Sequence, residues 1–267
     1  MKGARATPRL AFGARVEPGE RMLPEEVAVA LSFNGTTQAV MMATPDDLVD
    51  FGYGFALTEG IARPEDILSV EIETLPRGRD LRVWVAPEAG ARLSARRRMM
   101  AGPVGCGLCG LDSLDQALRE VPSVPPSSFR LTPAQVMAAV AALPDQQRLH
   151  DATRAVHCAA FWTGDRITLA REDVGRHNAL DKLVGAMMRG GFPPEGAVVL
   201  TSRVSIDLVQ KVAMLGSAVI IAVSAPTADA VALAEQAGIT LIALARSDRF
   251  EVFSHSDRLT TEVPHVG

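Results

Sequence analysis

Residues 197–245 read AVVLTSRVSIDLVQKVAMLGSAVIIAVSAPTADAVALAEQAGITLIALA and alternate short apolar runs with longer amphipathic ones. The apolar runs have the length of buried strands, and the amphipathic runs have the length and spacing of helices. Strands alternating with helices are typical of βαβ crossovers. We therefore predict an α/β fold with a largely parallel sheet, with strands at 197–201, 218–223 and 239–245 and helices at 205–215 and 227–237.

Three loops follow the carboxyl ends of these strands, at 201–205, 224–227 and 245–250. In open α/β sheets, ligands bind at this edge. The loops are rich in hydroxyls and arginines, which suit a phosphate-bearing ligand at helix N-termini. The hydroxyls can also serve only as helix caps, which is our interpretation of Thr227. For Arg203, Arg246 and Arg249, ligand binding and a purely structural role both remain open.

The core domain is predicted to extend over residues 131–267. Thr132-Pro133 is a cap-plus-proline start for a helix at 134–143, and Gly164-Asp165 predicts a hairpin between runs 155–163 and 166–170. A last strand is expected at 251–254.

Residues 171–182, REDVGRHNALDK, form the most polar run of the chain. Asp173 is placed to cap a helix at 176–189, with His177 facing Asp181 and Asn178 facing Lys182 at a spacing of four residues. A ligand site or a dimer contact is the alternative interpretation. His157, beside Cys158 in an apolar run, is more typical of a core residue than of a base.

The first 130 residues divide into three predicted parts. Residues 1–20 mix Arg, Gly and Pro without periodicity and predict a disordered tail. Residues 21–90 predict a small α+β subdomain with a hairpin around Asn34-Gly35 and two further strands at 68–75 and 81–86. Between them, Thr44-Pro45-Asp46-Asp47 predicts a helix with Thr44 as N-cap, Pro45 at the first helical position and a stop at Gly60. Residues 91–130 hold a cysteine loop, a short helix and a Pro/Ser linker at 121–128.

The cysteine loop reads GCGLCG at 105–110 and places Cys106 and Cys109 among glycines. Arg92 and Arg96 to Arg98 precede it without an acidic residue, and positive potential lowers a thiol pKa and favours the thiolate. We therefore predict a reactive pair. A structural zinc half-site is the alternative, although no second CxxC is present to complete it. Two unreactive thiols in a turn are a further alternative, and no metal site is predicted.

The composition of the chain limits the classes of protein to which it can belong. The 267-residue chain carries a net charge of −4 and three cysteines. This charge argues against nucleic-acid binding, and the cysteine count argues for reduced thiols. No apolar run has the length of a membrane-spanning helix or of a signal peptide core, so we expect a cytoplasmic protein without a membrane partner.

These motifs together resemble a known family, the FdhD family of formate dehydrogenase accessory sulfurtransferases, over roughly residues 24–260. The resemblance rests on Asn34-Gly35, MATP at 42–45 with Gly54-Phe55 and Glu59-Gly60, CGLCG at 106–110, EDVGRHNALDK at 172–182 and SAPT at 224–227. EDVGRHNALDK is the most specific of these. The chain departs from the family pattern at Arg154-Ala155, where glycines are usual, and at Ser202, where the family has Ser-Gly-Arg.

The resemblance implies a sulfur carrier. Cys106 would accept persulfide sulfur from a cysteine desulfurase, with Cys109 as its partner, and pass it to the molybdenum bis-guanine-dinucleotide cofactor of formate dehydrogenase. The loop Ala245, Arg246, Ser247, Asp248, Arg249 and Phe250 would hold the guanine nucleotide, for which GDP is a mimic. The resemblance also implies a cytidine-deaminase-like core, a homodimer and contact with the formate dehydrogenase catalytic subunit.

Three other functions compete. A non-catalytic chaperone would bind the molybdenum cofactor while its cysteines are incidental. A zinc deaminase would need a glutamate two residues after a histidine and a proline before the CxxC, and neither His150 nor His157 is followed by that glutamate. A thioredoxin-like protein would place its CxxC at a helix start after an early strand, unlike this mid-chain loop.

Overall fold

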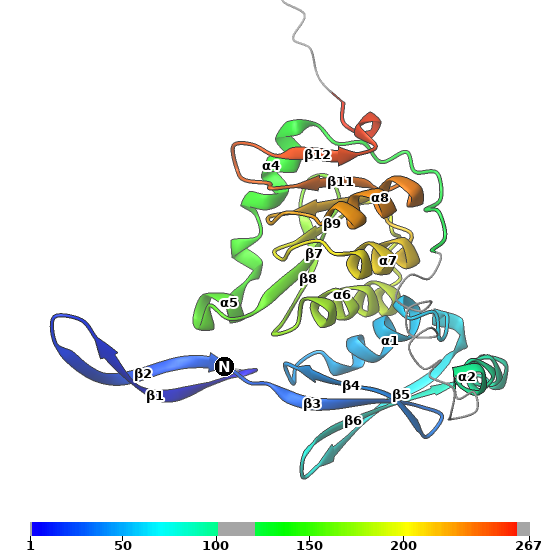
Figure 1. Cartoon of the computed structure of the whole chain (residues 1–267), viewed down its shortest axis with the longest axis horizontal. Helices are drawn as coiled ribbons and strands as arrows, with labels where there is room; N and C mark the ends of the chain where they lie inside the picture. Colours follow the sequence, from blue (N-terminus) through cyan, green and yellow to red (C-terminus); the bar gives the residue numbers. More distant parts are fainter. Residues whose placement is uncertain (1, 101–120, 261–267) are drawn as a thin grey trace, which may run out of the picture.

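The computed structural model describes residues 2–100 and 121–260, and they form a mixed α/β structure with three sheets (Figure 1). The largest is a six-stranded sheet in the order β12-β11-β10-β9-β7-β8. Its strands are β7 (His157–Trp162), β8 (Ile167–Asp173), β9 (Ala197–Leu200), β10 (Val219–Ala222), β11 (Thr240–Ala243) and β12 (Glu251–Ser254). The predicted strand and helix alternation at 197–245 is confirmed.

The prediction of a largely parallel sheet is wrong. Only the pairs β9–β10 and β10–β11 are parallel, whereas β7 pairs antiparallel with β8 and with β9, and β12 pairs antiparallel with β11. Residues 163–166 connect β7 to β8, and the loop 244–250 connects β11 to β12. Both connections reverse the chain without a helix, whereas a parallel pair needs a longer crossover. The sheet is therefore mixed, with a parallel centre.

Helices cover both faces of this sheet (Figure 1). On one face α6 (Arg176–Gly190), α7 (Ile206–Leu215) and α8 (Ala228–Ala237) pack on side chains such as Phe161, Leu200 and Ile220. On the other, α4 (Pro133–Ala141) packs on Val199 and Ile221. A short 3-10 helix (Pro144–Gln146) leads to α5 (Arg148–Thr153). Burial on both faces explains why the central strands are apolar throughout.

The N-terminal half contains a four-stranded sheet in the order β4-β3-β6-β5. Its strands are β3 (Val27–Phe33), β4 (Thr36–Ala43), β5 (Ile67–Leu75) and β6 (Gly78–Val85). Helix α1 (Leu48–Thr58) packs on one face through Phe51 and Phe55, and a 3-10 helix (Pro64–Asp66) and α2 (Pro87–Met100) follow. The predicted turn is confirmed, because Asn34 and Gly35 both have positive φ, as a tight hairpin requires.

The prediction of a disordered tail at 1–20 is wrong. Strands β1 (Ala4–Phe12) and β2 (Val16–Pro24) pair antiparallel along their whole length. Ala4 is buried against Leu149 and Val156, and this contact anchors the base of the hairpin on the body. The tail lacks helical periodicity, but its alternation along two short strands supports a ribbon. The other predicted part boundaries, near residues 90 and 130, stay predictions.

The two larger sheets meet where helices α1 and α6 cross (Figure 1). A Cβ atom at Gly54 would overlap the carbonyl oxygen of Asp181, and one at Gly185 would overlap that of Asp50. Glycine at both positions therefore lets the two backbones touch. Among the described helices, none is long and apolar enough to cross a membrane.

We expect Gly185→Ala to lower the free energy of unfolding by about 3 kcal/mol or more, since its methyl group would meet backbone rather than a movable side chain. Urea denaturation followed by circular dichroism measures this. Gly13→Ala is the matched control, because Gly13 lies in an open turn and should change stability by less than about 0.5 kcal/mol. Equal midpoints for the two variants would contradict the close helix crossing.

Candidate functional site

The polar run at 171–182 is built around the fully buried carboxylate of Asp173. Its Oδ2 accepts from the Thr44 amide at 3.0 Å and from Lys182 Nζ at 2.6 Å. Its Oδ1 accepts from the Gly175 amide at 2.8 Å and from Asn178 Nδ2 at 3.0 Å. Four donors from two halves of the chain thus surround one carboxylate.

The donors also bind the segment between β4 and α1. Lys182 Nζ donates to the Thr44 carbonyl at 2.9 Å, Asn178 Nδ2 donates to the Met42 carbonyl at 2.8 Å, and the Val174 amide donates to Thr44 Oγ1.

The predictions that Thr44 caps α1 and that Asp173 caps α6 are wrong. Gly175 occupies the N-cap of α6, Asp47 occupies that of α1, and neither makes a side-chain cap bond. Instead, the Asp173 carboxylate accepts from the Thr44 amide, and the Thr44 hydroxyl accepts from the Val174 amide.

A second buried network joins α6, α7 and α1. Lys211 Nζ on α7 lies 2.9 Å from Asp181 Oδ1 and 2.7 Å from Glu59 Oε1, and Thr58 Oγ1 donates to Asp181 at 2.7 Å. Burial lowers the pKa of Lys211, but the carboxylates of Asp181 and Glu59 outweigh burial and leave that pKa raised. Asp181 therefore pairs with Lys211 and not, as predicted, with His177.

A third network centres on Asp50 of α1, which is buried. Its carboxylate accepts from Arg171 Nε at 2.8 Å and from Arg189 Nη1 at 2.5 Å. All three networks cross from the N-terminal half to the α/β core. The polar run that suggested a ligand site is thus accounted for by the contact between the two halves, and a buried pair that loses one member leaves an uncompensated charge.

Two histidines, His157 and His177, lie near the start of α6. His177 pairs with Asp207 of α7, a partner that sequence spacing did not indicate. Burial lowers the pKa of His177, against the pull of Asp207. Half-buried His157 begins β7, and burial followed by nearby Arg176 lowers its pKa as well. Both imidazoles therefore favour the neutral form.

The structure brings the three strand-end loops together at one edge. The Val204 amide donates to the Ala225 carbonyl, and the Leu244 amide donates to the Ser224 carbonyl. Arg203 is exposed in the first of these loops, as are Arg246, Ser247, Asp248 and Arg249 in the third. An anion at this edge would meet guanidinium groups and a hydroxyl.

The residues of loop 245–250 differ in what they can offer a ligand. Ala245 is fully buried and Phe250 packs on the core, so their side chains serve the fold. Arg246 Nη1 donates to the carbonyl of Val223, the residue after β10, at 2.5 Å, and this bond holds the loop beside the end of that strand. Arg249 is paired only loosely with Asp248, at 3.8 Å, with both side chains over 70% exposed. Arg249 and Arg203 are thus the arginines that this edge presents most openly.

The two departures from the family pattern have different structural settings. Arg154 ends α5 in the left-handed region, at φ 59°, where glycine is the usual C-cap. The glycine that is usual in the family at this position would adopt the left-handed conformation without strain, which is a role in the backbone turn. Ser202 is buried and its hydroxyl donates to the Arg203 carbonyl, so it holds the loop that carries Arg203.

Cys106 and Cys109 lie outside the described residues. Of the arginines before them, Arg92 is described, and it lies 2.9 Å from the Asp66 carboxylate, which offsets part of its charge. Cys158 is buried, and burial followed by the Glu172 carboxylate raises its pKa to about 12. A thiol in that state is a poor nucleophile.

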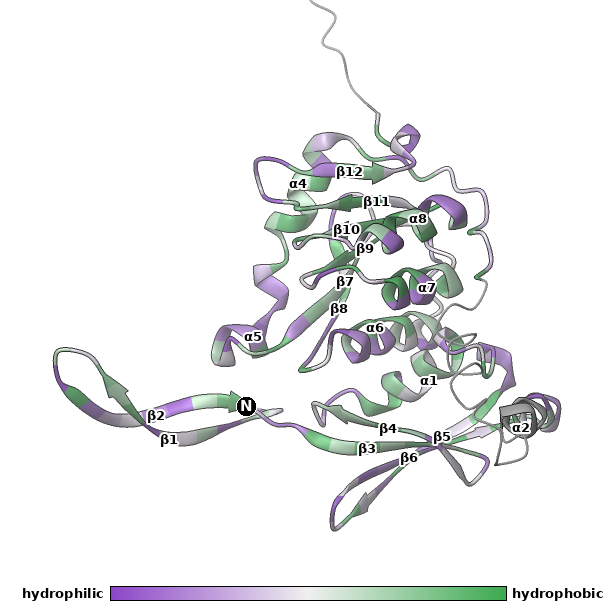
Figure 2. Ribbon diagram, viewed as in Figure 1, coloured by the Kyte–Doolittle hydropathy of each residue, from purple (hydrophilic) through white to green (hydrophobic). Residues whose placement is uncertain are grey.

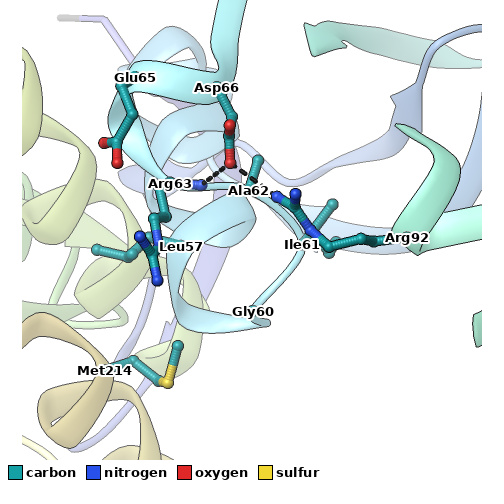
Figure 3. A pocket seen from close by; sticks show the side chains of 9 residues that line it. All are labelled: Leu57, Gly60, Ile61, Ala62, Arg63, Glu65, Asp66, Arg92 and Met214. Carbon is teal, nitrogen blue, oxygen red and sulfur yellow. Dashed lines mark hydrogen bonds and ion pairs between the residues drawn. The ribbon is translucent and has the colours of Figure 1, made fainter. Parts of the chain in front are cut away.

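A pocket of about 470 Å³ lies beside α2 (Figure 3). Its apolar lining includes Leu57, Ile61 and Met214, and its charged lining includes Arg63 and Arg92. In Figure 1, α2 and the loop between β11 and β12 lie on opposite sides of the molecule. Within residues 2–100 and 121–260, no three His, Cys, Asp or Glu side chains gather as a metal site.

Comparison with known proteins places this architecture in a class of accessory proteins. The structure is similar to a crystal structure described as that of a candidate formate dehydrogenase accessory protein from Desulfotalea psychrophila, with a TM-score of 0.77, 25% identity and coverage of 96% of this chain and 99% of that one. Two relatives named sulfur carrier protein FdhD are 50% identical, from Agrobacterium fabrum, and 47% identical, from Cupriavidus necator. The alignments cover 90% of this chain and of the first relative, and 93% of this chain and 89% of the second.

The FdhD/NarQ family model matches residues 24–260, and the chain belongs to that family. The resemblance drawn from the sequence motifs is confirmed.

Because Cys158 is buried with a raised pKa, we expect it to resist alkylation in the folded protein. In the variant Cys106→Ala/Cys109→Ala, iodoacetamide at mildly alkaline pH should add nothing to the native chain and one group per chain in denaturant. Intact-mass spectrometry measures both states. Rapid labelling of the native variant would show that Cys158 is an accessible third thiol.

Proposed function

We propose that this chain is a sulfur carrier that serves the assembly of formate dehydrogenase. The observation that carries the proposal is 50% identity to a protein named as a sulfur carrier, in a chain with two candidate thiols. The third, Cys158, is buried with a pKa of about 12. The similarity to a candidate formate dehydrogenase accessory protein supports formate dehydrogenase as the enzyme that the transferred sulfur serves.

The proposed chemistry runs through Cys106 and Cys109. The Cys106 thiolate attacks the outer sulfur of a persulfide on a cysteine desulfurase; the donor S–S bond breaks, the donor leaves as a thiolate, and Cys106 holds the persulfide. Attack of the Cys109 thiolate on Cys106 then releases hydrosulfide and leaves a Cys106–Cys109 disulfide. The pair itself supplies the two electrons that reduce the transferred sulfur.

The proposed sulfur acceptor is the molybdenum bis-guanine-dinucleotide cofactor, a substrate destined for the formate dehydrogenase catalytic subunit. Its phosphates suit the edge that carries Arg203, Arg246, Ser247 and Arg249, because guanidinium groups and hydroxyls donate to phosphate oxygens. A cytidine-deaminase-like core, a cytoplasmic location and a homodimer belong to the same proposal.

Incubation with a cysteine desulfurase and cysteine, followed by intact-mass spectrometry, tests the sulfur-accepting step. We expect one added sulfur on the wild-type chain and none on Cys106→Ala. Cys109→Ala should still load sulfur and should release it more slowly, because the resolving thiol is missing. Equal loading of Cys106→Ala and wild type would remove Cys106 from this role.

Binding of GDP tests the cofactor edge. We expect Arg203→Ala/Arg249→Ala to weaken GDP binding about 10- to 100-fold, as loss of charge-assisted hydrogen bonds should. Arg166→Ala is the matched control, since Arg166 is an exposed arginine in the β7–β8 turn. Isothermal titration calorimetry measures the affinities. Unchanged binding in the double variant would move the nucleotide site elsewhere, and binding without persulfide loading would favour the chaperone function.

A further inference from the structure

The pocket beside α2 has no part in the chemistry proposed so far. Its volume of about 470 Å³ lies within the range of roughly 300–1,000 Å³ that is typical of ligand pockets. Figure 2 shows hydrophobic stretches on α1 and α7, the helices that supply Leu57 and Met214 to its lining. A Cβ atom at Gly60 would lie 3.9 Å from Met214 Cε. We call this cavity the α2 pocket, because Arg92 of α2 also lines it.

Backbone hydrogen bonds fix the wall of the pocket that follows α1. The Gly60 amide donates to the Leu57 carbonyl at 2.9 Å. The amides of Ile61 and Ala62 donate to the Ala56 carbonyl at 2.8 and 3.1 Å, and both side chains are buried. The pocket is therefore preformed, and a group that enters it does not first have to order a loop.

Among the described residues, the pocket carries one arginine without a carboxylate partner. Asp66 Oδ2 accepts from the Arg63 amide at 3.1 Å and from Arg92 Nη2 at 2.9 Å, and so offsets part of the Arg92 charge. The Arg63 guanidinium pairs with no carboxylate within residues 2–100 and 121–260. In Figure 3 it extends toward Met214, whereas Glu65 lies at the opposite end of the view from Met214. The pocket therefore suits an apolar group with a carboxylate beside it.

Helix α2 leads from this pocket to the two candidate thiols. Arg92 precedes the end of α2, at Met100, by eight residues, which is about 12 Å of helix. Cys106 follows Met100 by six residues, and an extended chain of that length spans about 22 Å at most. An interface of standard size, with about 800 Å² per partner, is roughly 30 Å across. One partner protein can therefore contact the pocket and the thiol together.

We propose that the α2 pocket receives an apolar side chain of the protein that donates persulfide sulfur, with a carboxylate of that protein on Arg63. This docking site rests on the proposed function, because it serves the sulfur-accepting step. Cys106 can attack a protein-bound persulfide only where the two proteins touch, so the donor has to contact the surface near that thiol. An apolar anchor in a preformed pocket with an ion pair beside it is typical of the centre of such a contact.

The cofactor edge lies on the other side of the molecule from α2 (Figure 1). The sulfur donor and the nucleotide therefore do not compete for one surface. We expect saturating GDP to leave the KM of this protein, as a substrate of the desulfurase, unchanged within about 2-fold.

Sulfur loading from two donors tests the docking site. A cysteine desulfurase with cysteine is the protein donor. Tetrasulfide needs no docking surface, because a thiolate takes one of its sulfurs and trisulfide leaves. We expect Arg63→Glu/Met214→Glu to raise the KM for loading by the desulfurase about 10-fold or more, with tetrasulfide loading equal to wild type. Arg63→Lys, which keeps the charge, should stay within about 3-fold of the wild-type KM. Intact-mass spectrometry measures both reactions.

Arg166→Glu/Met42→Glu is the matched control. It makes the same change of charge at an exposed arginine in the β7–β8 turn and at a methionine of β4 that is 49% exposed. Its KM should equal that of wild type, and circular dichroism confirms the folding of every variant. Arg63→Glu alone, on an exposed side chain, keeps the test available if the double variant does not fold.

The outcomes separate the docking site from the function that it serves. If the wild-type chain takes up no sulfur from the desulfurase, the proposed function fails. If the wild type loads and the pocket variants keep its KM, the docking site alone is wrong. Loss of tetrasulfide loading in the pocket variants would show that the pocket acts on the thiol itself, and weakened GDP binding would assign the pocket to the cofactor. Either result would overturn the docking site.

Discussion

One buried carboxylate, that of Asp173, determines how the two halves of this chain meet. It accepts from Thr44 in the N-terminal half and from Gly175, Asn178 and Lys182 in the core. A desolvated charge is tolerated in a protein interior only where partners saturate it. Because Thr44 lies 129 residues before Asp173, the carboxylate is satisfied only when both halves are in place.

The helix crossing and the other two buried networks also depend on this contact between the two halves. Helices α1 and α6 touch at Gly54 and Gly185, and this contact brings Asp50 and Asp181 to the boundary, where arginines and Lys211 neutralise them. The EDVGRHNALDK motif at 172–182 therefore joins the two halves of the fold. The proposed chemistry is left to the strand-end loops and to the cysteine loop, whose preceding helix lies on the other side of the molecule.

Local patterns predicted what depends on local physics. Apolar runs gave the central strands, Asn34-Gly35 gave the hairpin turn, and the caps at Thr132 and Thr227 were predicted from adjacent residues. Long-range partners could not be predicted, because nothing near Asp173 in sequence indicates Thr44, and nothing near His177 indicates Asp207. The antiparallel pairing of β7 with β9 and of β12 with β11 is likewise decided by tertiary packing. The edge loops were predicted together because parallel strands end at one edge.

Cooperative unfolding of the two halves tests the central claim most directly, and the chain offers one tryptophan in each half, Trp84 in β6 and Trp162 in β7. Trp162→Phe leaves Trp84 as the reporter, and Trp84→Phe leaves Trp162. In urea, each fluorescence transition should coincide with the circular dichroism transition of the same variant. Adding Lys182→Met, which leaves Asp173 without its cation, should lower the midpoint and let the Trp84 transition precede the Trp162 transition. Separate transitions with Lys182 present, or an unchanged midpoint in Lys182→Met, would contradict the account.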